Sequence, residues 1–105
     1  MISEILTAAR LPHQEAQYPD PPKGSFAVWM ESVTADGSDF DNRVFTHDCT
    51  LELYAPTVEA GNKDRSRLFA ELNVRGIHYT TQGWYWLNNI RRYQEVIEFT
   101  YTTKS

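Results

Sequence analysis

The two side chains with the most chemical capacity are His47 and Cys49, which lie two positions apart in the segment RVFTHDCTLELYA. Imidazole and thiol groups bind zinc, and together they can form a nucleophile and its base. On a strand both point to one face, roughly 6 to 7 Å apart, which is beyond hydrogen-bond reach. Zinc needs further ligands, but no second cysteine exists, and His13 and His78 occupy a proline-rich segment and a strand start. We therefore expect a buried Cys49 beside a hydrogen-bonded His47, and no metal site.

The segment DGSDFDN, residues 36–42, carries three carboxylates, those of Asp36, Asp39 and Asp41. A calcium loop of the EF-hand type places oxygen ligands at alternate positions, followed by a glycine and a distal glutamate. Here the glycine comes second, and Asp, Asn and Gly are common turn formers. The segment predicts a solvated turn. Glycine-rich phosphate loops, GxSxG and HExxH motifs do not occur, so we expect neither an enzyme nor a cofactor.

Size and charge narrow the class of protein. A chain of 105 residues forms one domain, residues 1–105, with one modest core. Its net charge of -4, from 10 basic and 14 acidic residues, argues against generic nucleic-acid binding. The start MISEILTAARLPH lacks the basic and long apolar regions of a signal peptide, and no segment reaches the ~20 apolar residues of a membrane span. The single cysteine excludes an internal disulfide.

The elements that must position these side chains follow from periodicity and from turn residues. Apolar residues at helical spacing predict a short helix over 2–9, which Pro12 ends. The further expected elements are a proline-rich extended arm (12–25), strands over 26–33 and 43–55, a helix over 63–74, and strands over 77–87 and 90–103. This order, α-β-β-α-β-β, predicts a single small α+β domain with a mainly antiparallel four-stranded sheet and two helices.

Aromatic and basic residues near the last turn are candidates for a protein contact. Trp84, Tyr85 and Trp86 place large side chains on both faces of one strand, which is more than a small core needs. Arg91 and Arg92 follow the turn at Asn88 and Asn89. Because acidic residues come soon after them, we expect ion pairs rather than phosphate binding.

Six short motifs follow one another along nearly the whole chain: PPKGSFAVW, FDNRVF, LELYAPT, DRSRLFAEL, GIHY and YQEVIEF. Together with the amphipathic first helix, they resemble the small tail-completion, or tail terminator, proteins of long-tailed bacteriophages and prophages of Gram-positive bacteria. The resemblance implies a structural protein that forms a ring, generally a hexamer, at the head-proximal end of the tail tube. Such a ring ends tube growth and joins the tail to the head connector. The implied partners are further copies of the chain, the tail tube protein and the head-completion (stopper) protein, without specific nucleic-acid or membrane binding. The implied location is the virion tail or neck, reached from the host cytoplasm.

Within such a ring, a stiff arm could reach an adjacent subunit with little loss of entropy. The candidate contact residues are Pro19, Pro21, Pro22, Trp84, Trp86, Arg91 and Arg92. We expect acidic side chains to line the lumen, namely Glu31, Asp36, Asp39 and Asp41.

Three other interpretations remain open. The first is a stopper protein of the phage neck. The second is a small ligand-binding or enzymatic domain that uses His47, Cys49 and His78. The third is single-strand nucleic-acid binding through Trp84 and Trp86, which the net charge disfavours.

Overall fold

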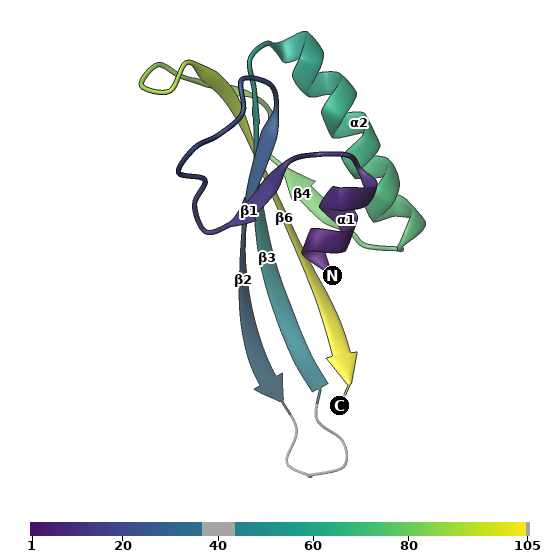
Figure 1. Cartoon of the computed structure of the whole chain (residues 1–105). Helices are drawn as coiled ribbons and strands as arrows, with labels where there is room; N and C mark the ends of the chain where they lie inside the picture. Colours follow the sequence, from purple (N-terminus) through teal and green to yellow (C-terminus); the bar gives the residue numbers. More distant parts are fainter. Residues whose placement is uncertain (37–43, 105) are drawn as a thin grey trace.

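The computed structural model describes residues 1–36 and 44–104, and Figure 1 shows how its elements are arranged. In chain order they are α1 (Ile2–Ala8), β1 (His13–Glu15), β2 (Phe26–Asp36), β3 (Val44–Ala55), α2 (Val58–Val74), β4 (Tyr79–Thr81), β5 (Tyr85–Leu87) and β6 (Arg92–Lys104). The strands form one six-stranded sheet in the order β1-β2-β3-β6-β4, and β5 pairs with β6 as well. β1 is parallel to β2, and the other pairs are antiparallel.

The expected four-stranded antiparallel sheet with the order α-β-β-α-β-β is therefore wrong, for two physical reasons. Residues 13–15 lie within the expected arm, but they pair with β2, because the amide of Ala27 donates to the carbonyl of Pro12 and the amide of Ala16 donates to that of Trp29 (both 2.8 Å). The expected strand over 77–87 is divided into β4 and β5 around Gly83, whose φ is 86°. Only glycine adopts such a φ easily, so the strand breaks there.

Both helices cover one face of the sheet and enclose the core. The alternation of side chains along β3 places Cys49, Leu51 and Leu53 on this face, where each is at most 2% exposed. Apolar side chains of α1 and α2 close over them: Ile2, Ile5, Leu6, Leu68 and Leu72. Burial of each such side chain contributes about 1.5 to 3 kcal/mol. The first helix thus lies in the core of its own chain.

The helix α2 begins earlier than its sequence pattern indicates. The hydroxyl of Thr57 accepts a hydrogen bond from the amide of Ala60 (3.1 Å) and caps the first turn. Gly61, which looks like a helix breaker in the sequence, is buried within this turn. The helix ends at Val74, and Gly76 follows with a φ of 70°. Within the described part of the chain, no helix has both the length and the apolar character that a bilayer crossing requires.

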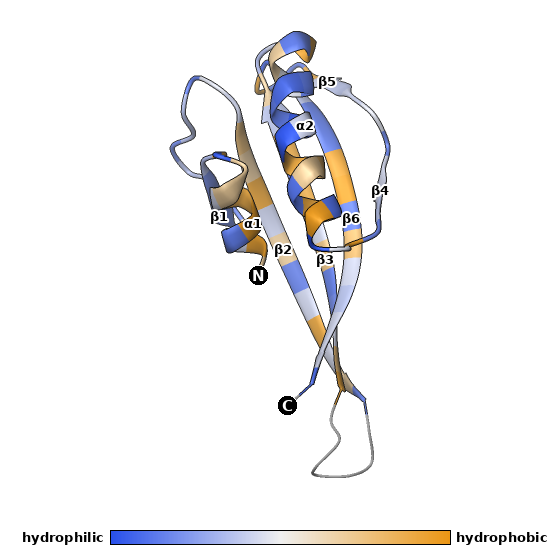
Figure 2. Ribbon diagram, turned by 90° about the vertical axis from the view of Figure 1, so that its right-hand side faces the viewer, coloured by the Kyte–Doolittle hydropathy of each residue, from blue (hydrophilic) through white to orange (hydrophobic). Residues whose placement is uncertain are grey.

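Three strands extend well beyond both helices at the end of the molecule near the C-terminus (Figures 1 and 2). We call this part the ribbon; it comprises residues 30–36 of β2, 44–48 of β3 and 100–104 of β6. It contributes to principal extents of 49 × 27 × 22 Å. No helix covers it among the described residues, and Val33 is 52% exposed there. The ribbon is held by its own backbone pairing and by side chains that cross its strands.

Candidate functional site

A hydrogen-bonded cluster joins the three strands of the ribbon on the side of the sheet that carries the helices. His47 of β3 donates from Nδ1 to Glu31 Oε1 of β2 (2.5 Å), and its Nε2 lies 2.8 Å from Thr103 Oγ1 of β6. Tyr101 of β6 donates its hydroxyl to the same Glu31 oxygen (2.7 Å), and its ring stacks on His47 at 4.3 Å. Because a carboxylate only accepts, the Nδ1 position must carry the proton. The cluster fixes the register of all three strands.

The electrostatics of the cluster favour an ionised Glu31. Burial raises the pKa of this carboxyl, but the hydrogen bonds from Tyr101 and His47 outweigh it, so the pKa lies below its usual range. Burial and then the hydrogen bond to Glu31 raise the pKa of the Tyr101 phenol. Tyr101 therefore keeps its proton and donates it to the carboxylate over the whole physiological range.

The order of atoms, carboxylate to imidazole to hydroxyl, matches that of a catalytic triad. Acyl transfer also needs hydrogen-bond donors for an oxyanion and a cavity that holds the substrate at the hydroxyl. Neither of the two cavities described below includes Glu31, His47 or Thr103. Within the described residues, the observed role of these side chains is to join the three strands.

Cys49 is buried in the core and His47 makes two hydrogen bonds, as predicted for these two side chains. Burial, followed by the carboxylates of Glu31 and Asp48, raises the pKa of the Cys49 thiol to about 12. A nucleophilic or metal-binding cysteine needs the thiolate. Among residues 1–36 and 44–104, moreover, no three His, Cys, Asp or Glu side chains gather as metal ligands would.

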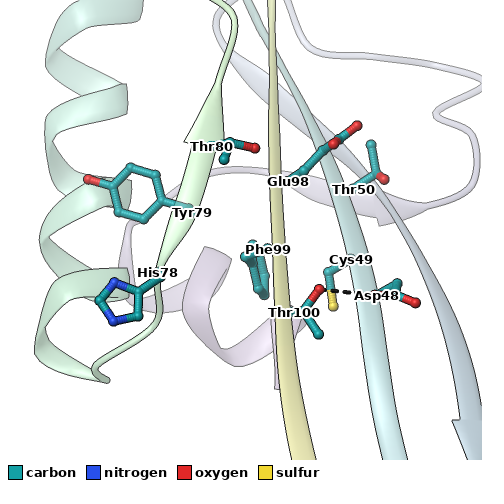
Figure 3. A pocket seen from close by; sticks show the side chains of 9 residues that line it. All are labelled: Asp48, Cys49, Thr50, His78, Tyr79, Thr80, Glu98, Phe99 and Thr100. Carbon is teal, nitrogen blue, oxygen red and sulfur yellow. Dashed lines mark hydrogen bonds between the residues drawn. The ribbon is translucent and has the colours of Figure 1, made fainter.

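A groove of about 610 Å³ crosses the edge where β4 meets β6 (Figure 3). Its floor on the helix-free face is polar: Thr50 and Glu98 are cross-strand neighbours, and Thr100 donates its hydroxyl to Asp48 (2.9 Å). His78, one of the residues of the ligand-binding interpretation, lies at its rim and is exposed. The groove brings acidic and hydroxyl groups together without a buried, unpaired polar side chain to orient a ligand.

The proline-rich segment folds over the helix-free face and encloses a second cavity of about 360 Å³. Pro21 and Pro22 line it, opposite Phe26 and Tyr54, whose rings stack at 4.9 Å. Pro19 is exposed. After β1, the segment thus packs against its own sheet, and its contact with an adjacent subunit stays a prediction.

The arginines after the turn have different surroundings. Arg92 donates from Nη2 to the carbonyl of Lys23 (2.8 Å), which fastens the proline-rich segment to β6. Arg91 is exposed at the end of the turn, with a φ of 54°. Asn88 and Asn89 tolerate the positive φ of a tight turn, but in this turn the positive φ lies at Arg91. No ion pair with an acidic residue joins either arginine to the described chain.

The two tryptophans predicted to make contacts differ in exposure. Trp84 packs on Gly61 of α2, donates from Nε1 to Asn62 Oδ1 (3.0 Å), and lies under the guanidinium of Arg65 at 5.6 Å. Trp86 is 48% exposed and leans on Tyr93 at 4.9 Å. Trp84 is therefore engaged within its own fold, whereas Trp86 remains available for contact.

The sequence did not lead us to predict the burial of Glu95, the most buried charged side chain among the described residues. Glu95 is fully buried, and its carboxylate accepts from Arg65 Nη1 (3.1 and 3.2 Å), from the amide of Gly83 (3.2 Å) and from the hydroxyl of Thr81. This carboxylate holds the break between β4 and β5 against α2. The signal was a glutamate at an apolar position of an alternating strand, between Tyr93 and Ile97.

The acidic residues expected in a lumen do not share one surface. Glu31 belongs to the cluster on the helix side, while Asp36 is exposed at the end of β2 and lies on the opposite face. Asp39 and Asp41 lie outside the described residues. A lumen-facing role for these carboxylates stays a prediction.

Comparison with known proteins gives a likeness of fold. No family model and no curated protein matches the chain. A solved structure described as the virion of a native gene transfer agent particle contains a chain that is 12% identical, with a TM-score of 0.67; the match covers 96% of this chain and 84% of that one. At such low identity, the likeness establishes that this chain has the fold of that particle's chain over nearly its whole length.

Proposed function

We propose that the chain is a structural virion protein of a phage-like particle, and that it acts as a tail terminator. The observation that carries this proposal is the likeness of fold, over 96% of the chain, to a protein of a gene transfer agent virion. The order of motifs that resembles tail-completion proteins supports the finer role. In this proposal the protein forms a ring of six copies, as the resemblance implies, on the head-proximal end of the tail tube.

The mechanism is geometric. One face of the ring stacks on the last ring of the tube, and its other face meets the stopper protein instead of recruiting further tube subunits. The chemistry of the described residues supports a role without catalysis, because the cysteine thiol is buried with a raised pKa and the carboxylate, imidazole and hydroxyl of the ribbon are used to join strands.

The test is assembly onto tube ends. The mass of the purified protein is measured by light scattering across a concentration series, before and after mixing with tail tubes from the phage or prophage that encodes it. We expect rings, or monomers that bind only at tube ends and stop elongation. A protein that ignores tubes but binds head connectors would replace the terminator role with that of a stopper. Binding to neither would overturn the proposal.

A further inference from the structure

Both outer strands of the ribbon have an unpaired edge. β1 covers β2 only from Ala27 to Trp29, and β4 covers β6 only from Ile97 to Phe99. Beyond these points, residues 30–36 and 100–104 pair with β3 alone among the described residues. The ribbon therefore carries one free edge on each side.

The direction of the backbone groups at the β2 edge follows from the pairing with β1. The amide of Ala27 and the carbonyl of Trp29 both bond toward β1. In a strand, the amide and carbonyl of one residue point the same way, and successive residues alternate. Glu31, Val33 and Ala35 therefore direct their amide and carbonyl groups to the free edge.

The same alternation fixes the groups at the β6 edge. The odd-numbered residues of β3 point toward β6, where their partners are odd-numbered too, as in the pair His47 and Tyr101. Even-numbered residues of β6 thus point outward: Thr100, Thr102 and Lys104. Each edge presents three outward residues at intervals of two, so the two edges match in length and spacing.

Neither edge has the features by which proteins prevent unwanted pairing. Exposed edges are normally blunted by proline, by bulges or by lysines along the strand. The β2 edge, MESVTAD, and the β6 edge, TYTTK, contain no proline or glycine. The side chain of Glu31 is held by His47 and Tyr101, and the other charges, Asp36 and Lys104, lie at the strand ends. Such edges are suited to pairing with another chain.

The orientation of the strands identifies that chain. β2 and β6 are both antiparallel to β3, so they run parallel to one another. A rotation about an axis along the strands brings β6 of one copy beside β2 of the next, in the parallel sense and with the same face outward. We infer that β2 of one copy pairs in parallel with β6 of the next copy, so that the ribbons form one closed sheet around the lumen. This inference rests on the proposed ring. Because the contact joins two different edges, it closes by rotation.

The helices determine which face of this sheet points inward. They occupy one face, and the proline-rich segment lies over the other face only outside the ribbon, at Phe26 and Tyr54. In this inference the helix-free face of the ribbon therefore lies toward the axis. Besides Met30, Val44 and Lys104, it presents hydroxyl groups and carboxylates: Ser32, Thr34, Asp36, Thr46, Asp48, Thr100 and Thr102. A polar lining with net negative charge suits a channel through which DNA passes without adhering.

Disulfide trapping tests the pairing. Thr34→Cys is combined in turn with Thr100→Cys, Thr102→Cys and Lys104→Cys, which allows three registers on the same face. Within one copy, Thr34 and Thr102 flank Thr46 and are two strand spacings apart, or about 10 Å, which is too far for a disulfide. Any bond between the two introduced thiols must therefore join two copies, and the native Cys49 is buried. The control pair, Val33→Cys with Thr102→Cys, uses the same edges but places the thiols on opposite faces.

We expect one of the three pairs to give a ladder of covalent oligomers in mild oxidant, and the control pair to stay monomeric on a non-reducing gel. Rings, free or on tube ends, that give no ladder with any of the three pairs would overturn the edge pairing and leave the terminator role intact. A ladder in a protein that binds no tube end would keep the pairing and remove the terminator role. A protein that associates under neither condition would overturn both.

A second variant tests the same pairing without cysteines. Val33→Pro removes an outward amide that has no partner among the residues the structure describes. The melting temperature should therefore change little, while ring formation is lost. Thr34→Pro removes an amide that bonds to β3, so the monomer itself should be destabilised. Normal rings from the Val33→Pro variant would contradict the inference.

Discussion

The guanidinium of Arg65 on α2 and the carboxylate of Glu95 on β6 form a bifurcated ion pair, in which Nη1 alone lies 3.1 and 3.2 Å from the two carboxylate oxygens and Glu95 is fully buried. The same carboxylate bonds the amide of Gly83, so one buried charge fastens the helix, the last strand and the break between β4 and β5. Only the carboxylate of this pair is fully buried, since the Arg65 side chain is 30% exposed. The buried carboxylate is therefore the charge that depends on its hydrogen-bond partners in place of water.

Replacing this carboxylate should therefore destabilise the fold. For Glu95→Gln we expect a loss of about 2 to 3 kcal/mol in the free energy of unfolding, since the amide loses the charge and turns its NH₂ group toward donors. Urea unfolding followed by circular dichroism measures it. Glu98→Gln is the matched control, because it removes the same charge from an exposed position of the same strand. It should stay within about 0.5 kcal/mol of the native protein. Equal effects of the two substitutions would contradict the anchoring role of Glu95.

Gly61→Ala should destabilise the protein, although alanine favours helices. A Cβ at this position would lie 2.5 and 2.6 Å from two ring atoms of Trp84 and 3.0 Å from Ala55 Cβ. Alanine in place of glycine gains up to about 1 kcal/mol of helix propensity, whereas overpacking costs typically 1 to 3 kcal/mol. The indole cannot move without losing Asn62 and Arg65, so we expect a net loss of about 1 to 2 kcal/mol.

Thermal unfolding of the Gly61→Ala variant, compared with Gly24→Ala, provides the measurement. A Cβ at Gly24 would meet nothing within 4 Å, so that variant should melt with the native protein. If Gly61→Ala raised the melting temperature, the indole would not rest on the helix as described.

Acidification should lower the free energy of unfolding, because it protonates Glu31 in the ribbon. The pKa of this carboxyl is lowered in the folded protein, so its stabilisation is present above the unfolded value of about 4.3 and is lost as the pH falls through the folded value. The free energy of unfolding should fall from about pH 5 downward. Glu31→Gln should be less stable than the native protein at pH 7 and should show a flatter acid limb. The control, Glu15→Gln, removes an exposed carboxylate on β1 and should keep the native acid limb.

Cys49 should be inert toward thiol reagents in the native protein. With a pKa raised to about 12, it contains only about 1 part in 10⁴ of thiolate at pH 8, and it is 2% exposed. We expect no reaction with a chromogenic disulfide reagent over hours, and complete reaction after unfolding in urea. A protein carrying Thr102→Cys offers an exposed thiol for comparison and should react once, promptly. Fast native labelling of Cys49 would restore the enzymatic interpretation.

Local patterns predicted those parts of the fold that depend on neighbours in the chain. The helical spacing of Ile2, Ile5 and Leu6 identified α1, and the alternation along β3 placed His47 and Cys49 on one face. These predictions succeed because burial on one side imposes a period on the residues themselves. The start of α2 was wrong, because Asn62 and Asp64 are good capping residues and the helix was expected over 63–74, whereas Thr57 caps it and it begins at Val58. Gly61 lies within the helix and makes room for the indole of Trp84.

Features that depend on distant partners were beyond the sequence. The parallel pairing of β1 with β2 needs the return of the chain after the proline-rich segment, and three residues carry too little periodicity to reveal it. The burial of Glu95 depends on Arg65, thirty positions away. The free edges at Val33 and Thr102 depend on where β1 and β4 stop, which no property of those two residues indicates.

Because the ribbon lies outside the core, substitutions in it should differ in genetic dominance from substitutions in the core. A core substitution lowers the amount of folded protein, and the native copies still work beside it. In the proposed ring, a copy with one blocked ribbon edge would still fold and join the growing assembly, but no neighbour could then complete the circle. If such copies make up half of a mixed population, only about one six-membered ring in 64 would contain native copies alone. Substitutions on the ribbon edge are therefore expected to be dominant, and those in the core recessive.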